Sequence, residues 1–181
     1  MLEGKKVRLR AIERGDLPRF VQWLNDREIL YFLARYMPLS NTEEERWFEQ
    51  HLKDEKSRVF AIETRGGVHI GNVALDKIDW KNGHAELGIF IGEKQVWGQG
   101  YGTDAVLTLL DFAFNEMNLH RIALHVMAFN QRAIRCYEKC GFVLEGTERE
   151  VVFRGGRYHD QLIMGILREE FDSRFKGGSD E

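Results

Sequence analysis

The chain has 181 residues, enough for one domain with a substantial core and too few for two ordinary domains. Hydrophobic residues make up 43% and charged residues 30%, which is typical of a folded globular protein. A formal net charge of -3 argues against a nucleic-acid partner, and no apolar run approaches the roughly 20 residues of a membrane helix. Because the first residues also lack the apolar core of a signal peptide, we expect a cytoplasmic protein without membrane contact.

The N-terminal part of the chain predicts a strand, a helix and a loop. Apolar and polar residues alternate over 7–11, which indicates a strand. The next segment has the apolar spacing of an amphipathic helix, with Asp16 in position to cap its start and Pro18 in its first turn. Residues 31–40 are expected to form a loop.

A second helix is predicted after this loop. Thr42 and Glu45 have the spacing of a capping box, in which each side chain accepts a hydrogen bond from the other residue's backbone. Phe48 and Leu52 lie one helical turn apart, so both are expected on the buried side of this helix.

The middle of the chain predicts an antiparallel hairpin and a further strand. Two apolar runs, 58–63 and 69–76, flank the turn residues 65–67, which include two glycines. Another run, 85–91, follows a polar turn and is also strand-like. A glycine-rich stretch comes directly after it.

Beyond the glycines, the pattern predicts a helix, a strand and a short helix. The first helix is expected over 103–117 and the strand over 121–127. The short helix is expected over 131–140, with Asn130 as its N-cap and Gly141 just past its end, where a positive φ suits glycine.

The final part of the chain predicts a second hairpin, with strands over 148–153 and 161–167. Taken together, the elements indicate an α/β or α+β domain with a mixed, mostly antiparallel central sheet and helices on both faces. Residues 1–175 are expected to form this one domain, and residues 176–181 a disordered polar tail.

The glycine-rich stretch lies between a predicted strand and the start of a predicted helix. Unpaired backbone N–H groups and the helix dipole attract an anion at such a place, and glycines let the anion come close. The stretch lacks the lysine of a phosphate-binding P-loop, and its third glycine comes one residue too early for a dinucleotide fingerprint. A pyrophosphate site and a plain turn therefore both remain open at this point.

A second motif narrows the choice. Asn130, Ala133, Tyr137 and the pair Gly141-Phe142 follow the turn with the spacing N-x-x-A-x-x-x-Y-x-x-x-G-F. With the glycine turn, this segment resembles the GCN5-related N-acetyltransferase superfamily, and in particular the branch of the spermidine and ribosomal-protein N-acetyltransferases. The resemblance covers about residues 7–171 and implies the acyl-CoA N-acyltransferase fold. One departure is Trp97, at a position where the superfamily usually has Gln or Arg.

The resemblance implies acetyl-CoA as the co-substrate, and no spacing of His, Asp or Cys residues indicates a metal site. The strand backbone is expected to pair with the pantetheine arm, the glycine turn to hold the pyrophosphate, and the side chain of Asn130 to bind pantetheine or merely to cap its helix. These candidate residues are Ile89, Phe90, Ile91, Trp97, Gly98, Gln99, Gly100, Tyr101, Gly102, Thr103 and Asn130.

Two side chains are candidates for proton transfer. By its match to the family's tyrosine, Tyr137 is expected to protonate the leaving sulfur. Glu86, on the strand beside the expected acetyl group, is a candidate to attract the acceptor ammonium or relay its proton, although a structural ion pair is an equal alternative. His84 and His125 are weaker base candidates. Cys136 and Cys140 are read as small buried residues.

The acceptor is the least determined part of the function. A polyamine such as spermidine is the first hypothesis, the α-amine of a protein such as a ribosomal protein is the second, and a CoA-binding sensor without turnover is the third. Acidic and aromatic groups in the segment between the first two helices suit a polyamine, although glutamates there also complement a helix dipole. A homodimer is expected from the family. These acceptor-side candidates are Tyr31, Phe32, Tyr36, Glu43, Glu44 and Glu45.

Overall fold

Strands from the whole length of the chain join in one sheet in the computed structural model, which describes residues 1–175. The strands are β1 (Leu2–Glu3), β2 (Val7–Ala11), β3 (Arg58–Thr64), β4 (His69–Asp79), β5 (His84–Ile91), β6 (Arg121–Met127), β7 (Val143–Arg154) and β8 (Arg157–Leu167). Their order in the sheet is β1-β2-β3-β4-β5-β6-β8-β7. Neighbours run antiparallel except β5 and β6, which are parallel, so the predicted mixed and mostly antiparallel sheet is confirmed.

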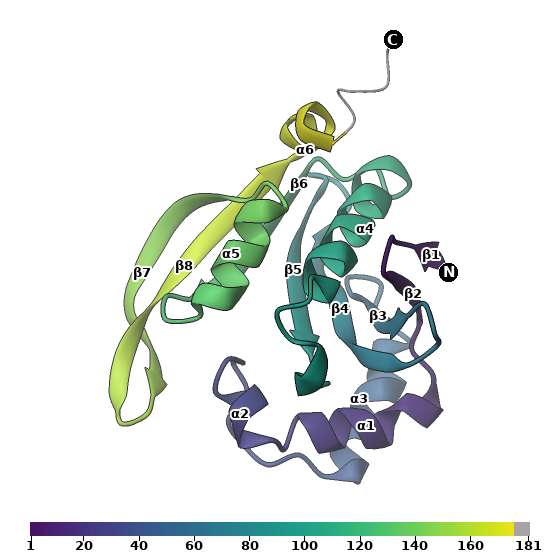
Figure 1. Ribbon diagram of the computed structural model, residues 1–181, viewed down its shortest axis with the longest axis vertical. Helices are drawn as coiled ribbons and strands as arrows, with labels where there is room; N and C mark the ends of the chain where they lie inside the picture. Colours follow the sequence, from purple (N-terminus) through teal and green to yellow (C-terminus); the bar gives the residue numbers. More distant parts are fainter. Residues whose placement is uncertain (176–181) are drawn as a thin grey trace.

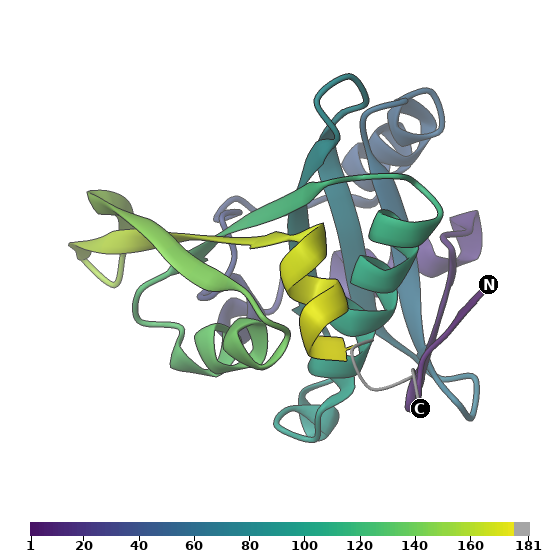
Figure 2. The same ribbon diagram turned by 90° about the horizontal axis from the view of Figure 1, so that it is seen from above.

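Helices cover both faces of this sheet, as predicted (Figure 2). On one face α4, α5 and α6 pack against the main core, while α1, α2 and α3 enclose a smaller core on the other. The helices are α1 (Leu17–Trp23), α2 (Arg27–Leu30), α3 (Asn41–His51), α4 (Tyr101–Asn115), α5 (Gln131–Lys139) and α6 (Arg168–Phe175), with short 3-10 turns η1 (Arg14–Asp16) and η2 (Lys94–Val96).

The start of α3 differs from the sequence prediction. Ser40, and not Thr42, is the N-cap: its hydroxyl accepts from the Glu43 N–H at 3.2 Å, while the Glu43 carboxylate accepts from the Ser40 N–H at 2.9 Å. The helix therefore begins two residues earlier than the Thr42–Glu45 box predicts. Leu52 then falls beyond the last turn and is 63% exposed, so its predicted burial is wrong, whereas Phe48 is buried.

Asp16 does not cap α1 with its side chain, contrary to the prediction. Its carboxylate instead accepts two hydrogen bonds from the Arg10 guanidinium, at 2.7 and 2.8 Å, and one from the Glu13 N–H at 2.8 Å. Burial of Asp16 opposes ionisation, but the bonds from Arg10 and Glu13 outweigh it and lower the pKa of the carboxyl. Asp16 thus fastens β2 to the start of the helical layer.

The C-terminal third is more regular than predicted. Strands β7 and β8 are both longer than the predicted runs 148–153 and 161–167, and their hairpin projects from the body of the molecule (Figure 1). The short helices α2 and α6 were not predicted, because each buries a single side chain and so lacks a periodic apolar face. The expected tail 176–181 lies outside the described residues.

Within residues 1–175, no helix is long and apolar enough to cross a membrane.

Candidate active site

The sheet opens into a fork between β5 and β6. Strand β5 pairs with β4 along its whole length, but it pairs with β6 only from His84↔Arg121 to Glu86↔Ala123. Beyond Glu86 the two strands part (Figure 1). Residues 87–91 of β5 therefore have no ladder partner on the β6 side among the described residues, which leaves a strand edge that an extended ligand can pair with.

Three of the predicted cofactor residues lie along this open edge. Ile89, Phe90 and Ile91 form the end of β5. The indole N–H of Trp97 donates to the Ile91 carbonyl at 2.8 Å, so this carbonyl is already used within the protein. Trp97 thus holds the end of the strand against the turn that follows it, a role that the sequence did not reveal.

The glycine turn leads from η2 into α4, as the sequence predicts. Gly98 and Gly100 have φ values of 74° and 85°, in the left-handed region that glycine adopts without strain, and Gly100 is the N-cap of α4. The N–H of Gln99 turns inward to the Val96 carbonyl at 3.4 Å. The first N–H groups of α4, from Tyr101 onward, have no carbonyl within the helix to bond, so they point out of its end as an anion site.

Two cations beside this turn escaped the sequence analysis. The ammonium of Lys6 donates to the Gln99 carbonyl at 2.7 Å and lies 5.6 Å from the centre of the Tyr101 ring. The guanidinium of Arg132, in the first turn of α5, lies 3.8 Å from the centre of the Trp97 ring. Arg132 lies inside the motif that begins at Asn130, so the sequence could have indicated it as a site residue. Nothing in the sequence near Lys6 indicates that its side chain lies beside the glycine turn.

Helix α5 presents the second motif. The side-chain oxygen of Asn130 accepts from the Ala133 N–H at 3.2 Å, which confirms that Asn130 caps the helix. Tyr137 is 7% exposed, and its ring meets that of Phe142 edge to face at 5.8 Å. Burial raises the pKa of Tyr137, so its phenol stays protonated at neutral pH and can donate a proton or a hydrogen bond.

The two cysteines fasten α5 to the first turn of α4. Cys140 is buried as predicted, and its thiol donates to the Thr103 carbonyl at 3.6 Å. Cys136 is only half-buried, with its sulfur 3.4 Å from the Thr103 hydroxyl. Hydrogen bonds from Cys140 and Thr103 lower the pKa of Cys136 to about 7. The thiols therefore act as polar contacts at this helix junction as well as filling space.

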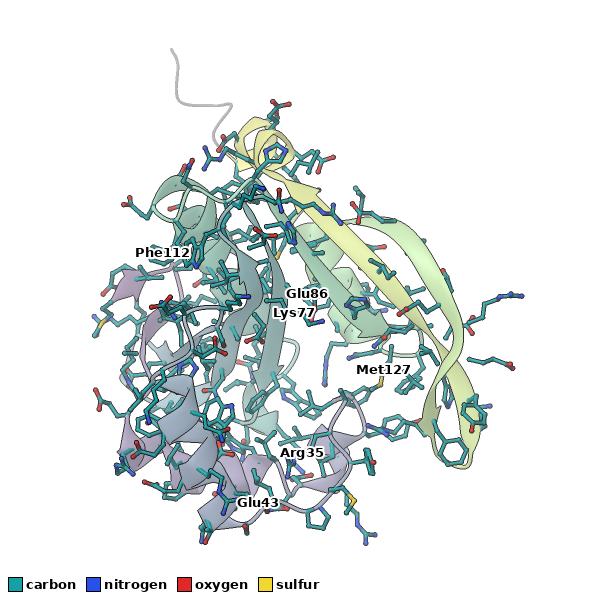
Figure 3. All side chains as sticks on the ribbon, turned by 180° about the vertical axis from the view of Figure 1, so that it is seen from behind. Arg35, Glu43, Lys77, Glu86, Phe112 and Met127 are labelled. Carbon is teal, nitrogen blue, oxygen red and sulfur yellow. The ribbon has the colours of Figure 1, made fainter. Side chains whose placement is uncertain are left out.

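Glu86 lies at the inner end of the fork beside a lysine and a histidine. The Lys77 ammonium contacts both of its carboxylate oxygens, at 3.0 and 2.9 Å, and Figure 3 shows the two side chains together. His125 of β6 lies 3.9 Å from Glu86 through Nδ1 and 4.0 Å from Glu148 through Nε2. His84 stands at the opposite, paired end of β5 and is exposed.

A cavity of about 450 Å³ opens on the face of the sheet that carries α1 and α3. Arg35, Glu43, Glu44 and Asp76 bring charges to its wall (Arg35 and Glu43 are labelled in Figure 3). Asp76 lies opposite Glu86 in the β4–β5 register, so both side chains are on this face. The cavity therefore lies on the same face of the sheet as Glu86, beside the end of β5.

The predicted acceptor-side residues divide into three groups. Glu43 and Glu44 line the cavity. Tyr31 and Phe32 pack against Phe129, at 5.0 and 6.2 Å between ring centres, which joins this segment to the β6–α5 connection. The other two residues, Tyr36 and Glu45, lie outside the cavity wall: Tyr36 is 74% exposed, and Glu45 pairs with Arg14.

The comparison with known families agrees with this geometry. Residues 6–143 match the family model for the acetyltransferase (GNAT) domain. The chain belongs to the GNAT family of acetyltransferases. It has the acyl-CoA N-acyltransferase fold, and it is an acetyl-CoA-dependent N-acetyltransferase. The residues fit this co-substrate: the fork supplies a free strand edge, and the glycine turn supplies backbone donors at a helix start.

Several GNAT relatives resemble this chain over most of its length. The spermidine N(1)-acetyltransferase of Vibrio cholerae serotype O1 is 37% identical over 172 residues, which cover 94% of this chain and 98% of that protein. A crystal structure of the Vibrio cholerae spermidine N-acetyltransferase with CoA and spermine has a TM-score of 0.87 and 36% identity, covering 92% of this chain and 98% of the other.

A more distant GNAT relative has a different name. The putative ribosomal N-acetyltransferase YdaF of Bacillus subtilis is 31% identical over 102 residues, covering 56% of this chain and 55% of that protein. Within the part of the chain that the structure describes, no group of three or more His, Cys, Asp or Glu side chains is placed to hold a metal ion.

Proposed function

We propose that this protein acetylates a primary amine of a polyamine such as spermidine. The observation that carries the proposal is the gathering of the carboxylates of Asp76, Glu86 and Glu148 around the inner end of the fork. Such a group attracts an acceptor with several ammonium groups. The likeness to the spermidine N(1)-acetyltransferase of Vibrio cholerae supports the same acceptor.

Two regions of this chain are proposed to hold acetyl-CoA. The backbone of Ile89 and Phe90, on the open edge of β5, pairs with the pantetheine arm. The N–H groups of the turn from Gly98 to Thr103 receive the pyrophosphate, except for that of Gln99, which is engaged by Val96. Asn130 keeps its helix cap through its side-chain oxygen in this scheme, and its amide nitrogen donates to the pantetheine arm.

The transfer has two proton requirements, which the proposal assigns to Glu86 and Tyr137. An alkyl ammonium with a pKa near 10.4 costs about 4 to 5 kcal/mol to deprotonate at pH 7. Glu86 holds the ammonium and takes its proton directly or through water. The amine then attacks the thioester carbon, the C–N bond forms as the C–S bond breaks, and the Tyr137 phenol gives its proton to the sulfur. The new amide nitrogen loses its second proton through water, which restores the phenol.

The proposed acceptor is tested by measuring thiol release from acetyl-CoA with spermidine, spermine, simple diamines and N-terminal peptides. We expect kcat/KM to be highest for spermidine or spermine. Faster thiol release with N-terminal peptides would show that the acceptor is a protein α-amine and not a polyamine. If the protein binds CoA but no acceptor causes thiol release, the result would favour a non-catalytic CoA sensor.

The role of Tyr137 is tested with Tyr137→Phe, which keeps the ring and its packing against Phe142. We expect kcat to fall by about 100-fold or more, the usual contribution of general acid catalysis, with little change in CoA affinity. Tyr158→Phe, a change at a tyrosine that is 63% exposed, is the matched control. An unchanged kcat in Tyr137→Phe would exclude the phenol from proton transfer.

A protein α-amine is the second candidate acceptor, favoured by the likeness to the ribosomal N-acetyltransferase of Bacillus subtilis. An α-ammonium with a pKa near 7.8 costs only about 1 kcal/mol to deprotonate at pH 7. Such an acceptor depends less on Glu86. A Glu86→Gln variant that keeps its activity on peptides while it loses activity on spermidine would separate the two.

The remaining proposals concern organisation. Residues 1–175 act as one N-acetyltransferase domain, supported by the single sheet that their strands form.

A homodimer through the β7–β8 hairpin is supported by apolar side chains that are at least half exposed there: Val143, Leu144, Val151, Phe153 and Tyr158. A cytoplasmic location is supported by the free thiols of Cys136 and Cys140.

A further inference from the structure

The proposed acceptor-binding carboxylate is already paired with an ammonium of the protein itself. Lys77 Nζ lies 3.0 Å from Oε1 and 2.9 Å from Oε2 of Glu86, so it bridges both oxygens (Figure 3). Glu86 is the last residue of β5 that pairs with β6. The lysine therefore lies where the strands part, at the point that an acceptor amine has to reach.

The backbone around Lys77 is irregular, and this irregularity directs the ammonium toward Glu86. The β4–β5 register shifts between Asp76 and Asp79, which marks an irregularity in β4. Lys77 lies within it at a φ of 51°, in the left-handed region that non-glycine residues rarely adopt. Its side chain is 72% exposed while that of Glu86 is 32% exposed, so the lysine can swing into solvent without disturbing the core.

Among residues 1–175, Lys77 and His125 are the two basic side chains that lie against Glu86, and two further carboxylates belong to the same region. Asp76 lies opposite it on β4 and accepts a hydrogen bond from the Ser57 hydroxyl at 2.6 Å. His125 lies 3.9 Å away on β6 and leads on to Glu148. The Lys77 ammonium on Glu86 is the chemical equivalent of one end of a polyamine.

We propose that Lys77 is a built-in competitor of the acceptor, whose ammonium must leave Glu86 before an acceptor ammonium can bind there. This inference rests on the proposed function, with Glu86 as the group that holds the acceptor. A monoamine only exchanges one exposed ion pair for another, which yields little free energy. A polyamine adds contacts to the neighbouring carboxylates and therefore binds more tightly than a monoamine, but the displacement of Lys77 costs both acceptors the same free energy.

The inference predicts that Lys77→Met binds amine acceptors more tightly. The KM for butylamine, for a diamine and for spermidine is expected to fall by a similar factor of about 2 to 5, the scale of one exposed ion pair. The kcat is expected to stay within about twofold, because in the complex with the acceptor Lys77 has already left Glu86. Lys77→Arg, which keeps a cation on Glu86, is expected to behave like the unaltered protein.

The matched control is Lys81→Met, which removes the same charge from an exposed lysine in the next turn. Titration calorimetry of spermidine and butylamine into the CoA-loaded protein measures the acceptor affinities without turnover. The inference is overturned if Lys77→Met raises or leaves unchanged the KM and Kd for butylamine, or if Lys81→Met lowers them equally. A failure of the proposed function differs, because the unaltered protein would then release no thiol with any amine.

Discussion

At the scale of single residues, the least ordinary group is Glu44, a carboxyl that is 5% exposed in the wall of the acceptor-side cavity. Burial raises its pKa from 4.5 to about 7, although the nearby Arg35 acts in the opposite direction. At neutral pH the folded protein therefore holds this side chain partly protonated. A cationic acceptor entering the cavity is expected to favour its ionised form.

This pKa predicts how stability depends on pH. Between about pH 4.5 and 7 the folded protein keeps a proton on Glu44 that the unfolded chain has lost, so stability falls as the pH rises through this range. In Glu44→Gln the side chain stays neutral at every pH, so this variant does not lose stability as the pH rises. At pH 8 it should therefore be more stable than the unaltered protein by about 1 to 3 kcal/mol. Near pH 4.5 the two should be alike.

Urea unfolding at several pH values measures this difference. Glu55→Gln, at an exposed position, is the control and should track the unaltered protein at every pH. A Glu44→Gln curve that ran parallel to that of the unaltered protein would show that Glu44 titrates normally in the fold.

At the scale of elements, the turn into α4 contains two glycines, Gly100 and Gly102, that have different structural roles. Gly100 has a φ of 85° and sets the direction of the first N–H groups of the helix. Gly102 already belongs to α4, and a Cβ there would meet the nearest side-chain atoms, of Cys136 and Ile91, at 3.9 Å, an ordinary contact. The backbone conformation at Gly100 is therefore the feature that an alanine would disturb.

Alanine substitutions at the two glycines are expected to act differently. Gly100→Ala forces an unfavourable conformation that costs about 1 to 2 kcal/mol, and we expect the Kd for CoA to rise about tenfold. Gly102→Ala should raise stability by about 0.5 to 1 kcal/mol, because alanine favours the helix, with a smaller change in CoA affinity. Calorimetric binding and thermal unfolding measure both, and equal CoA affinities in the two variants would contradict this assignment.

At the scale of the whole molecule, the N-terminal edge of the sheet is joined directly to α4, the helix proposed to bind CoA. The Asp104 carboxylate, in the first turn of α4, accepts from the N–H groups of Lys5, Lys6 and Val7 at 3.1, 2.7 and 3.0 Å. Lys6 then reaches the glycine turn. The position of the turn thus depends on a strand almost a hundred residues earlier in the chain.

Removal of this tie is expected to weaken both the fold and the CoA site. Asp104→Ala leaves three backbone donors without their partner, and we expect a loss of about 1 to 3 kcal/mol of unfolding free energy with weaker CoA binding. Asp104→Asn keeps an acceptor oxygen and should lose about half as much. Chemical unfolding with CoA titration measures both effects. A fully stable Asp104→Ala variant would mean that water replaces the carboxylate.

The sequence by itself determined the features that depend on short-range spacing. Alternation and helical periodicity located most strands and helices, and the glycine turn with the Asn130 and Tyr137 motif indicated acetyl-CoA. Each such signal lies within one element, where the backbone geometry is periodic. The same reasoning failed at Asp16 and Thr42, because several nearby residues can cap a helix and the packing of the chain selects one of them.

Only the tertiary structure decided which distant side chains meet. The contact of Lys77 with Glu86 depends on a register shift in β4, and no glycine or proline in the sequence indicates that shift. The places of Lys6 beside the turn and of Arg132 on Trp97 depend on how the sheet and helices pack. Contacts across strands follow from register and packing, which the order of residues within one element does not encode. The donor was therefore readable from motifs, whereas the competitor on Glu86 was visible only in the fold.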